Sequence, residues 1–103
     1  MKRFLISYSR EKVTEQEWHA RVAEFIRDIE NDAELKGKIL YTVMKAKDGT
    51  SYYHLAEVLD EKAGQLLQTR EFFKAYTAAT KQAGDDKVVV TPIETIAATT
   101  RPH

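Results

Sequence analysis

The alternation of hydrophobic and polar side chains at the start of the chain predicts a strand over residues 2–10. Phe4, Ile6 and Tyr8 alternate with smaller or more polar residues, so this strand has one strongly apolar face. Two further apolar runs, residues 38–47 and 50–59, are joined by Asp48-Gly49. This dipeptide favours a tight turn because glycine adopts positive φ without strain. The two runs are therefore expected to form an antiparallel hairpin.

A helix is predicted over residues 14–33 from a start signal and one apolar face. Thr14 and Glu17 have the spacing of a capping box, in which each side chain bonds the other residue's amide. Val13, before the cap, and Trp18, after it, have the spacing of a hydrophobic staple. The apolar positions that follow recur at helical intervals. They are Trp18, Val22, Phe25, Ile26 and Ile29.

A second helical segment is predicted after Asp60, which is a good N-cap. Thr69 is a plausible second cap if the helix restarts after a kink, and Gly84 suits a left-handed C-terminal cap. A last strand is predicted over residues 87–98, with Pro92 marking an edge, a bulge or a bend because proline donates no ladder hydrogen bond. The apolar positions of the helical segment keep helical spacing: Ala63, Leu66, Leu67, Phe73 and Tyr76.

The element order β-α-β-β-α-β predicts an α+β domain with the ferredoxin-like topology. Its antiparallel four-stranded sheet carries both helices on one face. We expect one domain over residues 1–98 and a loose C-terminal tail over residues 99–103. The strands are apolar on both faces, and a bare apolar face usually binds a partner. We therefore predict a homodimer through the open sheet face, which would form a dimeric α/β barrel.

Composition and charge narrow the functional classes. The 103 residues include no cysteine, which excludes disulfides, a thiolate nucleophile and cysteine-ligated metal sites. Lys+Arg and Asp+Glu both number 16, and this balance disfavours binding to nucleic acid or anionic lipid. No apolar run has the length of a signal-peptide core or a membrane span, so a soluble cytoplasmic protein is expected. No ligand spacing or glycine-rich loop indicates a metal or another cofactor, and none is predicted.

His54 is the main candidate for chemistry. With an ordinary pKa near 6.5, it can act as a general base toward a phenolic hydroxyl if it faces a pocket. The alternative is a surface or interface histidine on a hairpin strand. Tyr53 points to the opposite side of its strand, so at most one of the two lines a given pocket. Trp18, Tyr53, Phe72 and Tyr76 are the candidate substrate-binding residues, although buried aromatics also fill cores.

Other polar side chains of the predicted strands are weaker candidates for a functional role. Tyr8 and Tyr41 are further candidates for a hydrogen bond to a polar substrate. Glu57 is expected to pair across the sheet with Arg3 or Lys45, either in a stabilising ion pair or in a catalytic role.

The chain resembles the dimeric α/β-barrel superfamily, in particular the antibiotic biosynthesis monooxygenase type. The resemblance covers nearly the whole chain in element order and length, and its most specific stretch runs from residue 56 to residue 76. The matching residues are Ala56-Glu57, Asp60-Glu61 with Ala63, Phe73-Lys74-Ala75-Tyr76 and, in the last strand, Val90-Thr91-Pro92-Ile93-Glu94. The resemblance implies a pocket between the helices and the sheet of each protomer.

The family includes small cofactor-free oxygenases of quinols or polyphenolic rings, haem-degrading relatives and members without assigned activity. The chain departs from it where other members carry helix histidines, because Leu67 and Phe72 stand there. It also lacks the asparagine on the first strand and the tryptophan and histidine on the second helix that the haem-degrading relatives use, since its tryptophan, Trp18, is on the first predicted helix. The resemblance thus implies a cofactor-independent monooxygenase of a small aromatic or quinol-type substrate. The alternatives are a non-catalytic ligand-binding or regulatory barrel and a structural interaction module.

Overall fold

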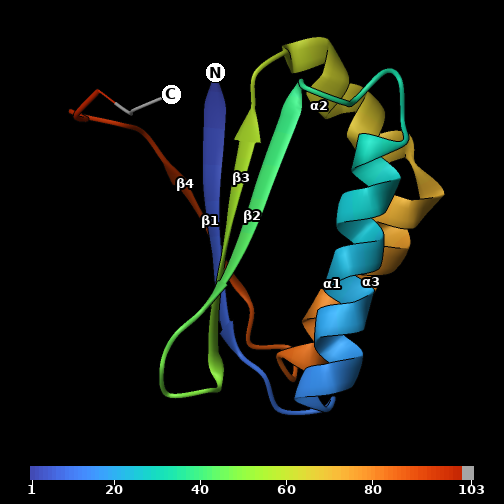
Figure 1. Cartoon of the computed structure of the whole chain (residues 1–103), viewed down its shortest axis with the longest axis vertical. Coiled ribbons are helices and arrows are strands. Elements are labelled where there is room, and N and C mark those ends of the chain that lie inside the picture. The colour runs from blue at the N-terminus through green and yellow to red at the C-terminus, as the bar shows by residue number, and fades with distance from the viewer. Residues whose placement is uncertain (101–103) are drawn as a thin grey trace.

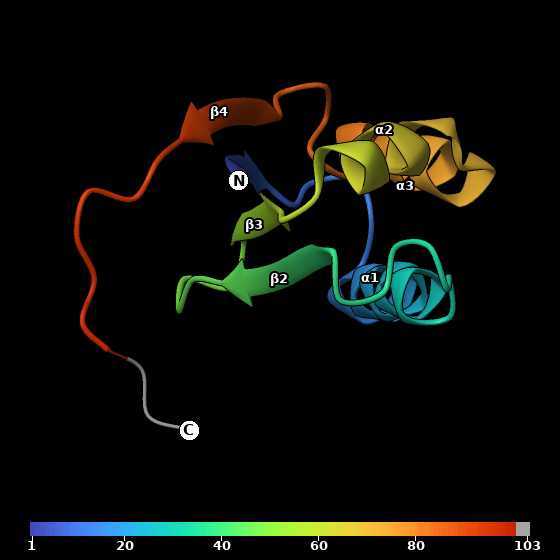
Figure 2. The same ribbon diagram turned by 90° about the horizontal axis from the view of Figure 1, so that it is seen from above.

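The computed structural model describes residues 1–100 and shows one sheet covered by helices on one face only (Figures 1 and 2). The sheet is antiparallel, in the order β2-β3-β1-β4. This is the predicted ferredoxin-like α+β arrangement, with the second helical segment divided in two. The elements are β1 (Lys2–Ser9), α1 (Glu15–Glu30), β2 (Ile39–Lys45), β3 (Ser51–Val58), α2 (Glu61–Thr69), α3 (Glu71–Ala83) and β4 (Val89–Ile93).

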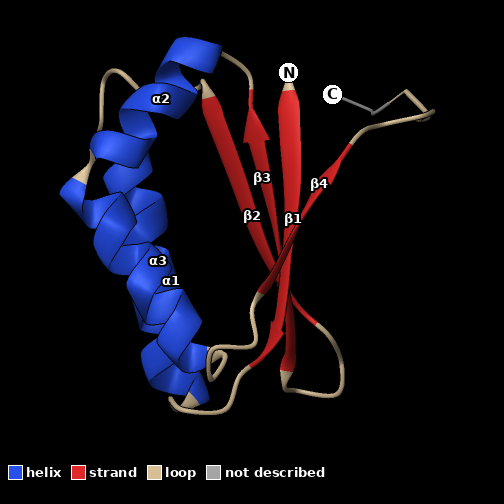
Figure 3. Cartoon of the chain, turned by 180° about the vertical axis from the view of Figure 1, so that it is seen from behind, coloured by secondary structure: helices blue, strands red, loops and turns tan. Residues whose placement is uncertain are grey.

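The strand register determines which side chains meet beneath the helices. Ile6 of β1 stands opposite His54 of β3 and Val90 of β4, and Val43 of β2 stands on the other side of His54. Because successive side chains of a strand alternate between faces, Tyr8, Tyr52 and His54 all face the helices. Figure 3 shows the other face of the sheet without any covering element.

The start of α1 follows the predicted capping signal with one difference. The Glu17 amide donates to Thr14 Oγ1 at 3.2 Å, as expected for a capping box. The Glu17 carboxylate, however, accepts from the Thr14 hydroxyl at 2.8 Å and not from the Thr14 amide. Four positions of the predicted stripe are buried against the sheet and the other helices, and Ile26 lies at its half-buried edge. The buried ones are Trp18, Val22, Phe25 and Ile29.

The second helical segment breaks at Arg70, whose extended backbone separates α2 from α3. Asp60 caps α2 as predicted, through a hydrogen bond from the Lys62 amide at 2.9 Å. The prediction that Thr69 caps the restarted helix was wrong. Its hydroxyl donates back to the Leu66 carbonyl at 2.6 Å. Arg70 takes the N-cap position of α3, and its side chain makes no capping hydrogen bond to the helix.

The C-terminal region corrects two further expectations. Gly84 has φ −88°, and the left-handed residues are Asp85 and Asp86. The glycine is instead required by close packing, since a Cβ there would lie 2.8 Å from Val88 Cγ2. The last strand is shorter than predicted, because β4 ends at Ile93, just after Pro92 on this edge strand.

The core lies between the sheet and the three helices and is rich in aromatic rings. Its largest fully buried side chains are Trp18, Tyr52, Phe25, Leu35 and His54. The predicted loose tail begins at residue 99, and residues 101–103 lie outside the described part of the chain. In residues 1–100 no helix combines the length and the apolar character needed to cross a membrane.

Candidate functional site

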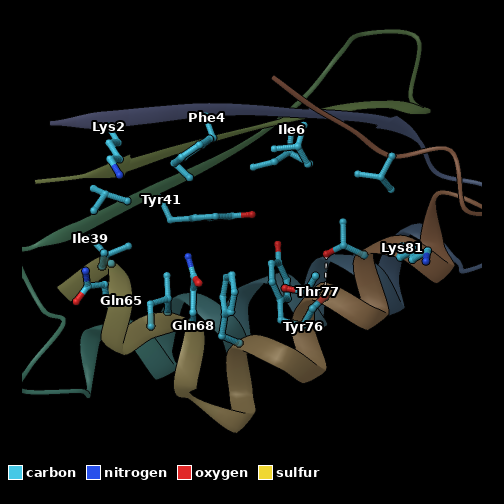
Figure 4. A pocket seen from close by; sticks show the side chains of 18 of the residues that line it. Lys2, Phe4, Ile6, Ile39, Tyr41, Gln65, Gln68, Tyr76, Thr77 and Lys81 are labelled. Atoms are coloured by element: carbon cyan, nitrogen blue, oxygen red, sulfur yellow. Dashed lines mark hydrogen bonds between the residues drawn. The ribbon is translucent and has the colours of Figure 1, made fainter. Parts of the chain in front are cut away.

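A pocket of about 560 Å³ lies between the sheet and the helices α2 and α3. In Figure 4, Phe4 and Ile6 of β1 lie on the strand side, Tyr76 and Thr77 lie on the helix side, and Tyr41 projects between them. Most of the wall is apolar, which suits a ligand that is largely hydrocarbon. Charged groups stand at exposed positions of its lining: Lys2, Glu61, Lys81 and Asp86.

Behind two of the pocket's tyrosines lies a buried hydrogen-bonded cluster centred on His54. The Tyr41 hydroxyl is 2.7 Å from His54 Nδ1, and the Tyr76 hydroxyl is 3.3 Å from the same atom. On the other side of the ring, His54 Nε2 is 2.6 Å from the Tyr8 hydroxyl. Trp18 Nε1 donates to that hydroxyl at 2.8 Å. Four elements, β1, α1, β2 and α3, therefore converge on one histidine of β3.

The hydrogen-bonding capacity of these groups indicates where the imidazole proton sits. The indole of Trp18 is a donor only, so the Tyr8 proton has His54 Nε2 as its acceptor. In a neutral ring the proton then lies on Nδ1 and is donated to Tyr41. The opposite tautomer would leave the buried Tyr8 proton without an acceptor, at a cost of about 1–3 kcal/mol. The cluster thus forms a donor chain that runs from Trp18 toward the pocket.

The protonation states of His54, Tyr41 and Tyr76 agree with a donor chain that runs from Trp18 toward the pocket. Burial lowers the pKa of His54 to about 4, so the ring is neutral near pH 7. Burial also raises the pKa of Tyr41 and of Tyr76 well above the ordinary tyrosine value, so both phenols keep their protons. No charge is needed inside the cluster, and its hydroxyl groups remain hydrogen-bond donors over the physiological range.

The structure places the predicted site residues in different surroundings. Tyr76 lines the pocket, whereas His54 lies behind it and is 0% exposed. Trp18 also lies outside the pocket lining and stacks on Tyr76, with the ring centroids 6.0 Å apart. Phe72 packs beside Phe25, with a centroid distance of 6.1 Å, and is likewise absent from the lining.

Tyr53 has a different location from the other candidates. It is 41% exposed on the open face of the sheet, and it therefore does not line the pocket. The physical reason is strand alternation, because its neighbours Tyr52 and His54 both face the helices. On the same open face, Glu57 accepts from Arg3 Nε at 3.0 Å, which confirms the ion pair expected across the sheet.

The second histidine in the described part of the chain, His19, does not join the cluster. His19 Nε2 lies 2.8 Å from the hydroxyl of Tyr52, whose ring stacks on Tyr8 with centroids 5.6 Å apart. In the part of the chain that the structure describes, no three His, Asp or Glu side chains come together in a way that would hold a metal ion.

Sequence reasoning gave low weight to Tyr41 and Tyr8, which are the direct partners of His54. Strand parity places Tyr8 on the apolar face with Phe4 and Ile6, as the sequence predicted. It could not have shown that Tyr8 and Tyr41 approach opposite nitrogens of one imidazole. That arrangement depends on the register between three strands.

Comparison with known proteins identifies the fold. No protein-family model and no curated protein matches the sequence. Among solved structures, a mutant of SnoaB, a cofactor-independent oxygenase from Streptomyces nogalater, matches with a TM-score of 0.76 and 12% identity over 97% of both chains. An antibiotic biosynthesis monooxygenase matches with a TM-score of 0.73 and 11% identity, covering 94% of this chain and 100% of that one.

A third structure, Rv0793 from Mycobacterium tuberculosis, matches with a TM-score of 0.73 and 13% identity, covering 96% of this chain and 98% of that one. At such low identity the similarity concerns the path of the backbone and not the site residues. The ferredoxin-like sheet, the helices on one face and these matches agree: the chain has the fold of the antibiotic biosynthesis monooxygenase proteins.

Proposed function

We propose that the pocket binds a small, flat, mostly apolar molecule and that the protein is a cofactor-independent oxygenase of an aromatic or quinol-type substrate. The observation that carries the proposal is the apolar pocket of about 560 Å³ with the hydroxyls of Tyr41 and Tyr76 backed by His54. The shared fold with SnoaB, itself a cofactor-independent oxygenase, supports the reaction class.

The proposed chemistry needs an electron-rich substrate anion, since a ring reacts with oxygen most readily after it loses a proton. Tyr41 and Tyr76 favour this anion by donating hydrogen bonds to its oxygen in a pocket whose wall is mostly apolar. For a quinol, one oxygen atom enters the ring to give a hydroxyquinone, and the other leaves as water. All four electrons come from the substrate.

His54 has an indirect part in this proposal. It does not line the pocket, and its Nε2 lone pair is occupied by Tyr8. Its contribution is to donate its Nδ1–H to the hydroxyl of Tyr41. Because Nδ1 then carries a proton and Nε2 accepts from Tyr8, His54 does not take the substrate's proton, which passes to water at the mouth of the pocket. This differs from direct proton abstraction by His54, the mechanism expected for a histidine on the pocket wall.

Oxygen uptake with a panel of quinols tests the proposal. Removing one donor with Tyr41→Phe is expected to lower kcat/KM by about ten- to a hundredfold. Tyr52→Phe is the matched control, because it removes a buried hydroxyl whose hydrogen-bond partner within residues 1–100 is His19 and not His54. With labelled oxygen, the product should gain one labelled atom. The oxygenase proposal fails if no quinol gives uptake above the uncatalysed rate.

A second candidate function is ligand binding without catalysis. It is favoured by the occupation of both ring nitrogens of His54, which leaves no free imidazole lone pair facing the pocket. Saturable binding of aromatic compounds without oxygen uptake would support this function over the first.

We also propose that a second copy of the chain covers the open sheet face. Leu40 and Met44 of β2 are each 43% exposed there, and Val89 of β4 is 57% exposed. Together with Tyr53 they make an apolar surface of a kind that usually marks an interface. A two-fold axis would place the same patch on both partners and bring two sheets face to face.

A further inference from the structure

We propose that Tyr8 is a positioning residue that makes the inner polar wall of the pocket a hydrogen-bond donor. The pocket would then select planar aromatic ligands that present an acceptor, such as a carbonyl or phenolate oxygen. This inference rests on the proposed role of the pocket in ligand binding and names the class of ligand that it takes.

The first step concerns the proton of Tyr8. Its hydroxyl has two neighbours in the cluster, Trp18 Nε1 at 2.8 Å and His54 Nε2 at 2.6 Å. The indole nitrogen cannot accept, so the Tyr8 proton goes to His54. Because Trp18 donates to the same oxygen, the bonds of that hydroxyl have fixed directions.

The second step concerns Nδ1, the other nitrogen of the His54 imidazole. With Nε2 accepting, a neutral His54 carries its proton on Nδ1. The Tyr41 oxygen at 2.7 Å is closer to this atom than the Tyr76 oxygen at 3.3 Å, so Tyr41 accepts the bond. Tyr41 and Tyr76 then each retain a hydroxyl proton. Even if one of them donates to the other, one proton remains directed to the pocket.

The remaining polar groups of the pocket do not reverse this preference. Gln65 and Gln68 line it from α2, and Thr77 lines it from α3, but all three are exposed at its edge, as are the charged side chains of the lining. The hydroxyl of Thr80, which is buried in the lining, donates to the Tyr76 carbonyl at 2.9 Å. Amides and hydroxyls offer both donors and acceptors, so they discriminate little between ligands. The discrimination comes from the buried hydroxyls, where an unmatched donor on the ligand would lose its hydration without compensation.

Nitrogen-15 NMR of the imidazole tests the position of the proton without any ligand. In the wild-type protein at neutral pH the His54 signals should show a protonated Nδ1 and an unprotonated Nε2. In Tyr8→Phe the acceptor requirement on Nε2 disappears, and a mixture of tautomers is expected. Tyr52→Phe should keep the wild-type signals, because that ring stacks on Tyr8 but its hydroxyl bonds to His19.

Calorimetric titration with 1-tetralone and tetralin tests the ligand class, because the two compounds differ mainly in a carbonyl oxygen. The wild-type protein should bind the ketone about three- to tenfold more tightly, as expected for one net hydrogen bond. In Tyr8→Phe this ratio should fall toward one while the affinity for tetralin is unchanged. Tyr52→Phe should keep both affinities.

The inference is overturned by a proton on Nε2 in the wild-type protein, by equal binding of the two compounds, or by binding of neither. An equal loss of ketone preference in Tyr52→Phe would also overturn it, since the effect would then come from packing. Neither measurement involves oxygen. Failure of oxygen uptake with these results intact would therefore reject the oxygenase proposal alone.

Discussion

At the scale of single residues, the cluster around His54 shows how a polar group is accommodated in an aromatic core. The imidazole is fully buried, and both of its nitrogens meet tyrosine hydroxyls. Trp18 completes the arrangement by satisfying the oxygen of Tyr8. Burying a polar group without partners is costly, so the tyrosines are the reason that this position tolerates histidine.

Protonation of His54 is expected to destabilise the fold. Its pKa is about 4 in the folded protein and near 6.5 when unfolded, so between these values the unfolded state binds more protons. The histidine's contribution is fully present above about pH 6.5 and is lost as the pH falls through about 4. The loss amounts to at most about 3 kcal/mol. Urea unfolding at a series of pH values measures it.

The control for this prediction is His54→Gln, which keeps a polar side chain but does not titrate. The carboxylates also protonate between pH 4 and 5, and they are the same in both proteins. Between about pH 6.5 and pH 4, the wild-type protein should therefore lose more free energy of unfolding than the variant. Parallel losses in the two proteins would show that His54 does not carry the effect.

At the scale of elements, the break between α2 and α3 is tied to the loop after α1. Arg70 Nε donates to Asp32 Oδ2 at 2.9 Å, and Arg70 Nη2 donates to Glu34 at 2.8 Å. The same guanidinium lowers the pKa of Asp32 through its hydrogen bond. Because α2 and α3 both line the pocket, this contact fixes one wall relative to the rest of the domain.

Removing this contact should loosen the helix junction. Arg70→Ala is expected to lower the melting temperature by a few degrees and to speed amide exchange at the start of α3, because two carboxylates lose their shared partner. Lys74→Ala is the control, since its ion pair with Glu71 is exposed and 3.5 Å long. Similar effects of the two substitutions would contradict a special role for the junction.

The sequence was sufficient to predict most elements, because each has a local signal. Thr14 and Asp60 mark helix starts, and Asp48-Gly49 marks the hairpin. The role of Gly84 was not predictable in this way, since its cause is the nearness of Val88 and not a local turn. The length of the last strand was also missed, because strand ends depend on pairing with β1.

The candidate site was predictable only in part. Helical and strand spacing indicate which face of its own element each of Trp18, His54 and Tyr76 occupies. Spacing does not indicate which of these side chains reaches a cavity. The decisive facts are the register of Tyr8 and Tyr41 against His54 and the position of Tyr76 on α3. These are contacts between distant parts of the chain, and periodicity carries no information about them.

At the scale of the whole molecule, the sheet has one covered and one open face (Figure 2). The open face carries exposed apolar side chains and the Arg3–Glu57 ion pair. A single protomer of 103 residues buries only about 60–65% of its unfolded surface, so a partner would add substantially to its stability. Residues 94–100 extend away from the helices, with Ile96 88% exposed.

Charging the open face should separate the proposed dimer. Leu40→Lys places an ammonium group within the proposed apolar contact, and desolvating it is unfavourable. Sedimentation at micromolar concentration should show a dimer for the wild-type protein and a monomer for the variant. Ile96→Lys is the control, because it adds the same charge outside the sheet. A wild-type protein that sediments only as an 11.8 kDa species would contradict the proposal.

The position of Trp18 has a practical consequence. It is the only tryptophan of the chain, and its indole stacks on Tyr76, one of the pocket-lining residues. The tryptophan fluorescence of the unlabelled protein therefore originates from a single site, one ring away from the pocket. A compound library can be screened against this emission, so a ligand can be sought optically without an activity assay.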